Sequence, residues 1–299
     1  MQQLAAQYEL QDLLALPDEV ARNNWLAQHG GRVDAVVTSA AVGLSEATLH
    51  VLPHLRVISS FGVGLDKLPV AAAKARGVAV GYTPDVLNDC VADLAFALLL
   101  DVARSVSAAD RFVRRGDWPC GPFGLTRKVS GARLGLVGLG RIGRTIARRA
   151  SGFDMDIRYH SRRPVADVAW PHAPVLTELA RWADYLVVIT AGGPETRHLV
   201  NAEVLDALGA DGFLINVARG SVVDEAALLA ALQQRRIAGA GLDVYEHEPN
   251  VPEAFFALDN VVLAPHMASG TRETRQAMAD RVAENLAAFY ATGTLISAA

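Results

Sequence analysis

The chain has 299 residues, of which 51% are hydrophobic and 20% are charged, so it can bury a large core and is expected to form two domains. Its 28 Lys and Arg residues against 32 Asp and Glu residues give a formal net charge of -4, which lacks the basic surface that binds nucleic-acid phosphates. No apolar run approaches the roughly 18 residues of a membrane span, and no signal peptide is recognisable, so we expect a cytoplasmic protein without a membrane partner. The two cysteines, Cys90 and Cys120, have no metal-binding spacing, and no metal site is expected.

The first part of the chain alternates short β-branched runs with helical patterns, which is typical of an α/β domain. We expect strands at 35–39, 55–59 and 78–82, with helices over 44–52 and 68–77 between them. The start, MQQLAAQYEL, looks like a helix followed by a short strand. A helix that is apolar nearly all round is expected over 84–106, with Asp85 as its N-cap, buried between domains or subunits. The segment 114–124 is dense in Gly and Pro and predicts a surface excursion.

A second α/β series begins at Arg133. Its apolar runs, each followed by a turn and a helical pattern, suit parallel strands that are covered on both faces. We expect these strands at 133–137, 156–159, 185–190, 213–217, 237–244 and 261–264. The segment from Thr271 onward is typical of one amphipathic helix, which we expect to cross back to the first half of the chain. The whole pattern predicts an α/β protein with a doubly wound parallel sheet and a second, smaller sheet.

The segment GLVGLGRIG places Gly138, Gly140 and Gly143 in a GxGxxG motif directly after one predicted strand and directly before a helix. The first glycine permits a tight turn, the second lets the backbone approach a pyrophosphate, and the third lets helix and strand pack closely. The phosphates would then meet the N–H groups and the positive end of the helix. The motif therefore predicts a dinucleotide-binding site, although a tight turn that binds no ligand can have the same sequence pattern.

The segment IRYHSRRPV ends the next predicted strand, about twenty residues after the glycines, where an NAD site places an acid on the ribose 2′-hydroxyl. Here the strand is followed by Ser161, Arg162 and Arg163, and no acid is present. A carboxylate would repel a 2′-phosphate, whereas a hydroxyl and two guanidinium groups can donate hydrogen bonds to it. We therefore expect NADP(H) as the cofactor. The alternative is a pair of solvated loop arginines.

Three further residues follow predicted strands at the edge where open α/β sheets bind ligands: Arg219, Glu248 and His266. Taken singly, each has an ordinary explanation as a surface ion pair, a helix-start charge or a hydrogen-bonded imidazole. Together they supply an anion anchor, a carboxylate and an acid/base. A carboxylate beside an imidazole favours the imidazolium, so Glu248 would keep His266 protonated near neutral pH, which suits the reduction of a carbonyl.

Six segments together resemble the D-isomer-specific 2-hydroxyacid dehydrogenases, from about residue 34 to the end of the chain. They are GLVGLGRIG, INVARGSVVDE, GLDVYEHEP, LAPHMASG, TPDVLNDCVADLAFALLL and GPETRHLVN. Within that family, the SRR segment looks most like the NADP(H)-preferring glyoxylate/hydroxypyruvate and hydroxyphenylpyruvate reductases. The resemblance implies a Rossmann NADP-binding domain over 84–267 and a flavodoxin-like substrate domain formed by 1–83 and 268–299. It also implies a homodimer formed through the cofactor domains.

The resemblance assigns roles to individual residues. Arg219 matches the family's substrate-binding arginine, His266 its proton donor and Glu248 the partner of that histidine, while the backbone of Val63 and Gly64 matches a loop that holds the substrate carboxylate. Trp118 lies in the excursion that, in some of these reductases, reaches the active site of the partner subunit. The cofactor-binding residues implied are Gly138, Leu139, Gly140, Arg141, Ile142, Gly143, Ser161, Arg162, Arg163, Val217, Ala218, Arg219, Asp243, His266 and Ala268.

We therefore expect NADPH-dependent reduction of a small 2-keto acid, such as glyoxylate or hydroxypyruvate, to the D-2-hydroxy acid. Two alternatives stay open: a non-catalytic dinucleotide sensor on the same fold, and an NAD-dependent relative that acts on another 2-hydroxy acid. Formate dehydrogenase is disfavoured, because that relative carries an amide where Glu248 stands. One departure from the family lies in the first thirty residues, where family members usually begin with a strand before the first helix.

Overall fold

The computed structural model describes residues 2–299, which form two compact units. The first unit contains the chain up to Leu87 together with Thr271–Ala299, and the second unit contains Asn88–Gly270. Both units are α/β structures in which the strands β1 to β9 pair in parallel, as the sequence pattern predicted, and a single antiparallel bridge joins Gly81 to Ala298. The boundaries predicted from the sequence, after 83 and after 267, lie close to the boundaries of these units. The roles assigned to the two domains stay a prediction at this point.

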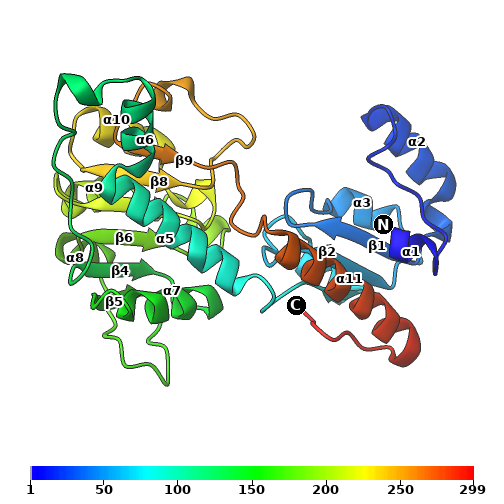
Figure 1. Ribbon diagram of the computed structural model, residues 1–299. Helices are drawn as coiled ribbons and strands as arrows, with labels where there is room; N and C mark the ends of the chain where they lie inside the picture. Colours follow the sequence, from blue (N-terminus) through cyan, green and yellow to red (C-terminus); the bar gives the residue numbers. More distant parts are fainter. Residues whose placement is uncertain (1) are drawn as a thin grey trace. The chain divides into compact units, whose positions relative to one another are not determined.

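The first unit is a three-stranded sheet in the order β1-β2-β3. Its elements are α1 (Gln2–Ala5), α2 (Glu19–His29), β1 (Ala35–Ser39), α3 (Glu46–His50), β2 (Val57–Phe61), α4 (Val70–Ala75), β3 (Ala79–Gly81) and α11 (Arg272–Thr292). Helix α11 begins where the Thr271 side chain accepts a hydrogen bond from the Thr274 N–H at 3.2 Å. It packs on β2, and Ser59 Oγ donates to the Val282 carbonyl at 3.3 Å. The prediction that this helix returns to the first half of the chain is confirmed (Figure 1).

Two predictions about the chain start and the long helix are wrong. Helix α1 ends at Ala5, and residues 6–18 contain no strand, because Asp12 Oδ1 accepts a hydrogen bond from the Leu14 N–H and turns the chain locally. Asp85 is not an N-cap: its φ is 70°, and helix α5 begins three residues later at Asn88. An Asp tolerates this left-handed conformation better than most residues do, so it serves as a turn before the helix.

The second unit is a six-stranded sheet in the order β5-β4-β6-β7-β8-β9. Its strands are β4 (Arg133–Val137), β5 (Asp156–His160), β6 (Tyr185–Val188), β7 (Phe213–Asn216), β8 (Gly239–Leu242) and β9 (Val261–Leu263). Its helices are α5 (Asn88–Arg104), α6 (Val106–Arg114), α7 (Arg141–Ser151), α8 (Leu176–Trp182), α9 (Ala202–Leu208) and α10 (Glu225–Gln233). A single parallel bridge between Tyr159 and His172 extends the sheet beyond β5. The chain reverses its direction across the sheet at β4, between β5 and β6, and such switch points are where open α/β sheets bind ligands.

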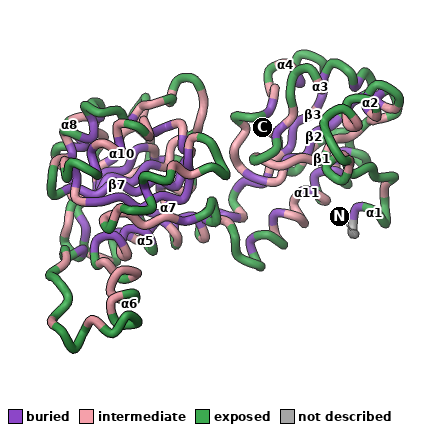
Figure 2. The backbone as a smooth tube through the Cα atoms, turned by 90° about the horizontal axis from the view of Figure 1, so that it is seen from above, coloured by how far each residue is buried: buried purple, intermediate pink, exposed green. Residues whose placement is uncertain are grey.

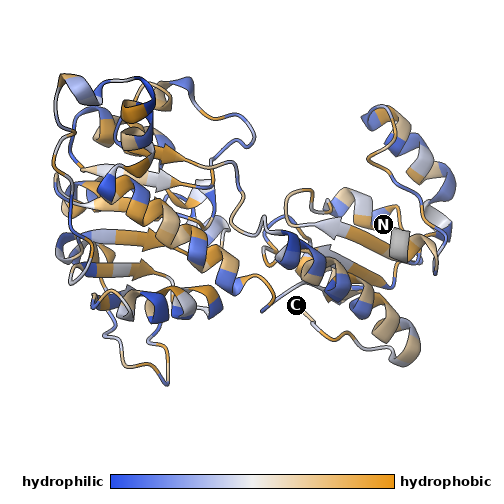
Figure 3. Ribbon diagram, viewed as in Figure 1, coloured by the Kyte–Doolittle hydropathy of each residue, from blue (hydrophilic) through white to orange (hydrophobic). Residues whose placement is uncertain are grey.

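Helices α5 and α7 cover one face of this sheet, and α8, α9 and α10 cover the other (Figure 1). Helix α5 is strongly apolar, as Figure 3 shows, and it packs on β7, β8 and β9 within the second unit. Two glycines of β8 allow its close approach, because a Cβ on Gly239 would lie 2.9 Å from Val102 Cγ2 and one on Gly241 would lie 2.9 Å from Leu98 Cβ. The burial of this helix is confirmed, but the face that it covers belongs to its own sheet, and its expected position between domains or subunits stays a prediction.

The long helix expected over 84–106 is divided at its C-terminal end. Ser105 adopts φ 53°, and the Asp101 carboxylate accepts a hydrogen bond from the Ser107 N–H at 2.8 Å, so α6 starts as a separate helix. No residue of α6 is buried, and the excursion that follows it contains only a short 3-10 turn, Trp118–Cys120. Figure 2 shows α6 and this excursion mostly in the colours of exposed and half-buried residues. Within residues 2–299, no helix is long and apolar enough to cross a membrane.

Candidate active site

The glycine motif forms the turn between β4 and α7. Gly138 has φ 106°, and a Cβ there would lie 2.9 Å from the Thr190 nitrogen, so only glycine fits. A Cβ on Gly143 would lie 2.5 Å from the Gly138 oxygen, which explains the close packing of helix and strand. At Gly140 a Cβ would meet no heavy atom within 4 Å, and this residue precedes α7 without a side-chain cap. The open space and the uncapped helix N-terminus fit the pyrophosphate of a dinucleotide.

The remaining residues predicted to contact the phosphates surround this turn. Leu139 is buried below it, and Arg141 and Ile142 are the first residues of α7. The Gly138 N–H donates to the His160 carbonyl at 2.9 Å, which joins the turn to the end of β5. The SRR segment therefore begins directly beside the glycine turn, as its position in the sequence predicted.

The side chains of Ser161 and Arg162 have different partners in the structure. Ser161 Oγ donates to the Arg163 carbonyl at 2.6 Å and so stabilises the turn itself. Arg162 forms an ion pair with Glu195, with 2.5 Å between Nη1 and Oε2, and the two side chains are 85% and 74% exposed. Glu195 belongs to the loop after β6, so this ion pair links the two loops that flank the glycine turn. Glu195 is not among the predicted site residues, although it lies in the GPETRHLVN segment that resembles the family.

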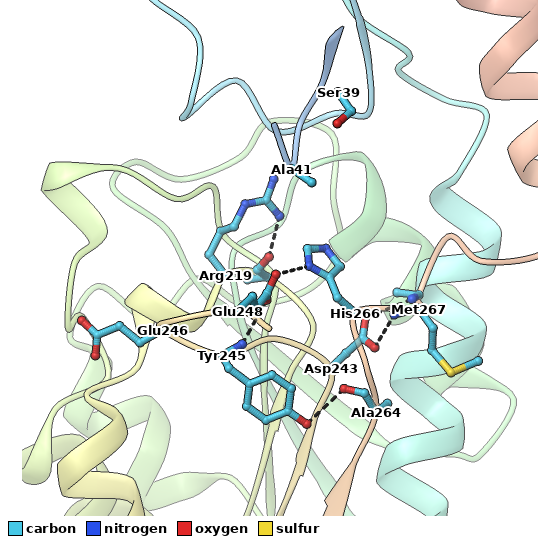
Figure 4. A network of polar contacts seen from close by, with 12 residues as sticks. Ser39, Ala41, Arg219, Asp243, Tyr245, Glu246, Glu248, Ala264, His266 and Met267 are labelled. Carbon is cyan, nitrogen blue, oxygen red and sulfur yellow. Dashed lines mark hydrogen bonds and ion pairs between the residues drawn. The ribbon is translucent and has the colours of Figure 1, made fainter. Parts of the chain in front are cut away.

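Glu248 and His266 meet in the loops that follow β8 and β9, at the other end of the sheet from β5. His266 Nδ1 lies 2.7 Å from Glu248 Oε2, and the other carboxylate oxygen accepts a hydrogen bond from the Tyr245 N–H at 3.1 Å (Figure 4). Burial favours the neutral form of Glu248, but the hydrogen bonds from His266 and Tyr245 and the charges of His266 and Arg219 outweigh it, so the pKa of this carboxyl is lowered. The side chains of Glu248 and His266 are 32% and 42% exposed, so a small molecule can reach them.

Asp243 shapes the loop that carries His266. Its buried carboxylate accepts hydrogen bonds from the N–H groups of Met267 at 2.7 Å and Ala268 at 3.0 Å, and its carbonyl accepts one from the His266 N–H at 2.8 Å. Burial raises the pKa of this carboxyl, and the two N–H groups only partly oppose that effect. Tyr245 supports the same loop from below, because its hydroxyl donates to the Ala264 carbonyl at 3.0 Å (Figure 4).

Arg219 lies in the loop after β7, directly after the buried residues Val217 and Ala218. The Asn216 side chain fixes this turn, since its Oδ1 accepts from the Ala218 N–H and its Nδ2 donates to the Arg219 carbonyl, both at 3.1 Å. The next residue, Gly220, packs against the Tyr245–Glu246 peptide, and a Cβ on it would lie 1.9 Å from the Tyr245 carbonyl carbon. The loops that carry Arg219 and Glu248 are therefore in direct contact, which no motif in the sequence indicates.

Val63 and Gly64 follow β2 in the first unit, in a loop fixed by Gly62. Gly62 has φ 137°, and its N–H donates to Thr83 Oγ1 at 3.0 Å, while its carbonyl accepts from the Thr83 N–H at 3.0 Å. Both predicted residues are half-buried. Across the described chain, 2–299, no group of three or more His, Cys, Asp or Glu side chains could hold a metal ion, and Cys90 and Cys120 form no disulfide.

Comparisons with known proteins show the family of this chain. The family model described as D-isomer specific 2-hydroxyacid dehydrogenase, NAD binding domain, matches residues 96–268. A glyoxylate/hydroxypyruvate reductase A from Arabidopsis thaliana is 48% identical over 272 residues, which cover 91% of this chain and 87% of the relative. A hydroxyphenylpyruvate reductase from Plectranthus scutellarioides is 47% identical over 277 residues, which cover 93% of this chain and 88% of the relative.

A solved structure shows the same similarity. An NADPH-dependent glyoxylate/hydroxypyruvate reductase from Sinorhizobium meliloti, in complex with NADP and malonate, has a TM-score of 0.87 and 43% sequence identity. The match covers 96% of this chain and 87% of that one. The second unit is thus an NAD(P)-binding domain, and the resemblance drawn from the six sequence segments is confirmed. The chain belongs to the D-isomer specific 2-hydroxyacid dehydrogenase family.

Proposed function

We propose that this chain is an NADPH-dependent reductase of small 2-keto acids, with glyoxylate and hydroxypyruvate as its first candidate substrates and the D-2-hydroxy acid as its product. The observation that carries the proposal is the 2.7 Å hydrogen bond between His266 Nδ1 and Glu248 Oε2, with Arg219 on the neighbouring loop. The names of relatives that are 48% and 43% identical support the choice of substrates.

The residues divide the chemistry between them. A reduced nicotinamide, when bound, supplies a hydride to C2 of the keto acid. Because Glu248 accepts the hydrogen bond of His266 Nδ1, the other ring nitrogen, Nε2, is the one that donates a proton to the keto oxygen. The lowered pKa of Glu248 keeps its carboxylate charged, and this carboxylate holds the imidazole ring in the orientation that the step needs. The Arg219 guanidinium binds the substrate carboxylate and stabilises negative charge on the oxygen as it develops.

The substrate carboxylate needs further donors, and we assign them to the backbone N–H groups of Val63 and Gly64. The turn that carries them is held in one shape by the pair of hydrogen bonds between Gly62 and Thr83. Backbone N–H groups in a fixed turn bind a carboxylate without losing side-chain entropy.

For the cofactor, we propose that Arg162 and Arg163 bind the 2′-phosphate of NADPH. Arg162 is paired with Glu195 in the structure, and the exposed pair is weak enough to exchange for a phosphate ester, which carries up to about two negative charges. The absence of an acid after β5 removes the group that would repel that phosphate. We assign the pyrophosphate to the glycine turn, and the nicotinamide to the surroundings of Val217, Ala218, Asp243 and Ala268.

We also propose a homodimer formed through the second unit. The surface that supports it consists of α6 and the excursion after it, where large apolar side chains are exposed. These side chains are Val106, Val113, Trp118, Phe123 and Leu125. Light scattering on the purified protein should give twice the 31.8 kDa of one chain, and Leu125→Asp combined with Trp118→Ser should give a monomer.

Steady-state kinetics test the proposed reaction. NADPH and NADH are compared with glyoxylate, hydroxypyruvate, pyruvate, phenylpyruvate and hydroxyphenylpyruvate. We expect turnover with the small keto acids and a higher kcat/KM with NADPH. A higher kcat/KM with NADH would overturn the assignment of the SRR segment. Tight NADPH binding without turnover of any 2-keto acid would instead support the non-catalytic sensor.

A further inference from the structure

Charged side chains also cluster around Glu246, two residues before Glu248 in the chain. Its carboxylate oxygen Oε1 accepts a hydrogen bond from Arg197 Nη2 at 2.6 Å and lies 3.3 Å from His198 Nε2. Its backbone N–H donates to Glu225 Oε2 at 3.2 Å. The Glu246 side chain is only 14% exposed, although the residues that follow it, from His247 to Asn250, are exposed to solvent.

This cluster joins three loops at the same edge of the sheet. Arg197 and His198 belong to the loop after β6, Glu225 begins α10 after the Arg219 loop, and Glu246 belongs to the loop after β8. The β6 loop is itself tied to the Arg219 loop, because the His198 N–H donates to the Ser221 carbonyl at 2.8 Å. Glu246 is thus the point at which the Glu248 loop is attached to its two neighbours.

The Glu246 carboxylate stays charged because of its hydrogen-bond donors. Burial favours the neutral form of Glu246, but the hydrogen bonds and charges of Arg197 and His198 outweigh it, and the pKa of Glu246 is lowered. Asp224 lies on the other side of His198, with 3.9 Å between Oδ2 and Nδ1. A partly buried carboxylate with charged donors holds its loop more firmly than a surface ion pair does, since solvent screens it less.

Hydrogen bonds within the Glu248 loop connect Glu246 to Glu248 and His266. The Tyr245–Glu246 peptide rests on Gly220, and the Tyr245 N–H donates to the same Glu248 carboxylate that binds His266. If the Glu246 side chain is removed, the Glu248 loop loses its hydrogen bonds to Arg197 and His198 and keeps only the contacts made by Tyr245, by the Glu246 backbone and by Glu248 itself. A displacement of about 1 Å is enough to cost a large part of a catalytic rate.

We propose that Glu246, held by Arg197 and His198, is a positioning residue that sets the orientation of Glu248 toward His266. It touches neither substrate nor cofactor and acts only through Glu248. The inference rests on the proposed function, because it takes the Glu248–His266 pair as the proton-donating unit.

The test compares Glu246→Ala with wild type, with Glu284→Ala as the matched control. Glu284 is also paired with an arginine, Arg281, at 3.0 Å, but on helix α11 of the first unit. We expect Glu246→Ala to lower kcat by at least about tenfold, with NADPH affinity and KM for the keto acid changed by less than about threefold. The low-field proton NMR signal of the His266 Nδ1–H bonded to Glu248 should broaden or disappear. Glu246→Gln should recover part of kcat because its amide oxygen still accepts from Arg197.

A double variant separates the positioning role from a general loss of structure. Glu246→Ala added to Glu248→Gln should lower kcat no further than Glu248→Gln alone. An equal additional loss in that background, or an unchanged kcat in Glu246→Ala, would show that the positioning role is wrong. A wild-type kcat in Glu248→Gln would instead show that the proposed proton-donating unit is wrong. If Glu246→Ala does not fold, Arg197→Ala removes the same hydrogen bond from a more exposed side chain and is judged by the same outcomes.

Discussion

The two ends of the ligand-binding edge in the second unit are built very differently. At the β5 end, Arg162 meets Glu195 in a surface ion pair between exposed side chains. At the β8 end, the supports of Glu248 and His266 are largely buried: Asp243 is 1% exposed and Tyr245 is 6% exposed. The groups assigned to proton transfer are therefore held by buried supports, whereas the groups assigned to cofactor choice lie in solvent, where they can exchange partners.

The largest effect should come from removing the group that donates the proton. His266→Ala should lower kcat by about 10²- to 10⁴-fold, the usual contribution of a general acid, while NADPH binding changes little. Stopped-flow turnover and fluorescence titration of NADPH measure the two quantities. Near-normal turnover would remove His266 from the mechanism.

The second prediction tests the contact between the Arg219 and Glu248 loops. In Gly220→Ala the new Cβ would lie 1.9 Å from the Tyr245 carbonyl carbon, so one of the two loops must move. We expect kcat to fall by roughly a hundredfold and the protein to lose about 1–3 kcal/mol of stability. Gly31→Ala is the control, since a Cβ there meets no heavy atom within 4 Å. Equal kcat values for the two variants would mean that this contact does not position the site.

The third prediction concerns the exposed end. Arg162→Ala combined with Arg163→Ala should weaken NADPH binding by about 10- to 100-fold and leave NADH binding nearly unchanged, because charge-assisted hydrogen bonds to the 2′-phosphate are lost. Isothermal titration with both cofactors measures this. A parallel loss of affinity for NADH would show that the arginines only maintain the fold of the loop.

Glu195→Gln should have a smaller effect of opposite sign. Removing the carboxylate that competes for Arg162 should tighten NADPH binding by about two- to fivefold, the magnitude of an exposed ion pair, without changing NADH binding. The gain should disappear when Arg162→Ala is already present. Unchanged NADPH affinity in the single variant would mean that the ion pair does not compete with the cofactor.

The smallest effect should appear in the pH dependence of stability. The pKa of Glu248 is lowered in the folded protein, so its contribution to stability is present above its ordinary pKa of 4.5 and is lost as the pH falls through the lower folded value. Glu248→Gln should therefore lose less stability than wild type below about pH 4.5. Urea unfolding at a series of pH values measures the difference. Parallel curves would contradict the direction of this pKa shift.

The sequence predicted the sheet elements well because buried parallel strands are nearly continuous apolar runs. The strands β1 and β4 have the predicted bounds, and the glycine turn has the predicted neighbours. The predicted start of α5 is wrong, because Asp is a residue type that often caps helices but Asp85 adopts the conformation of a turn. Local sequence patterns therefore predict which residues follow the strands at the ligand-binding edge of the sheet.

The supports of the site could not be read in the same way. Arg162 and Glu195 are 33 residues apart, and Arg197 and Glu246 are 49 residues apart. No periodicity links such pairs, because the folding of the sheet alone brings their loops together. Gly220 is a similar case, since its need for glycine comes from the Tyr245–Glu246 peptide and not from its own turn.

The construction of the first unit has a consequence for how this protein is made. The N-terminal cluster of Leu4 and Val57 is covered by Leu286 and Phe289 of α11, and the Ala299 N–H donates to the Val80 carbonyl at 2.8 Å. On the ribosome, strands β1 to β3 must therefore wait with one apolar face uncovered until the whole second unit has been synthesised. Domains generally fold in the order in which they are synthesised, but here we expect the later unit to complete its fold first, because α11 follows it in the chain.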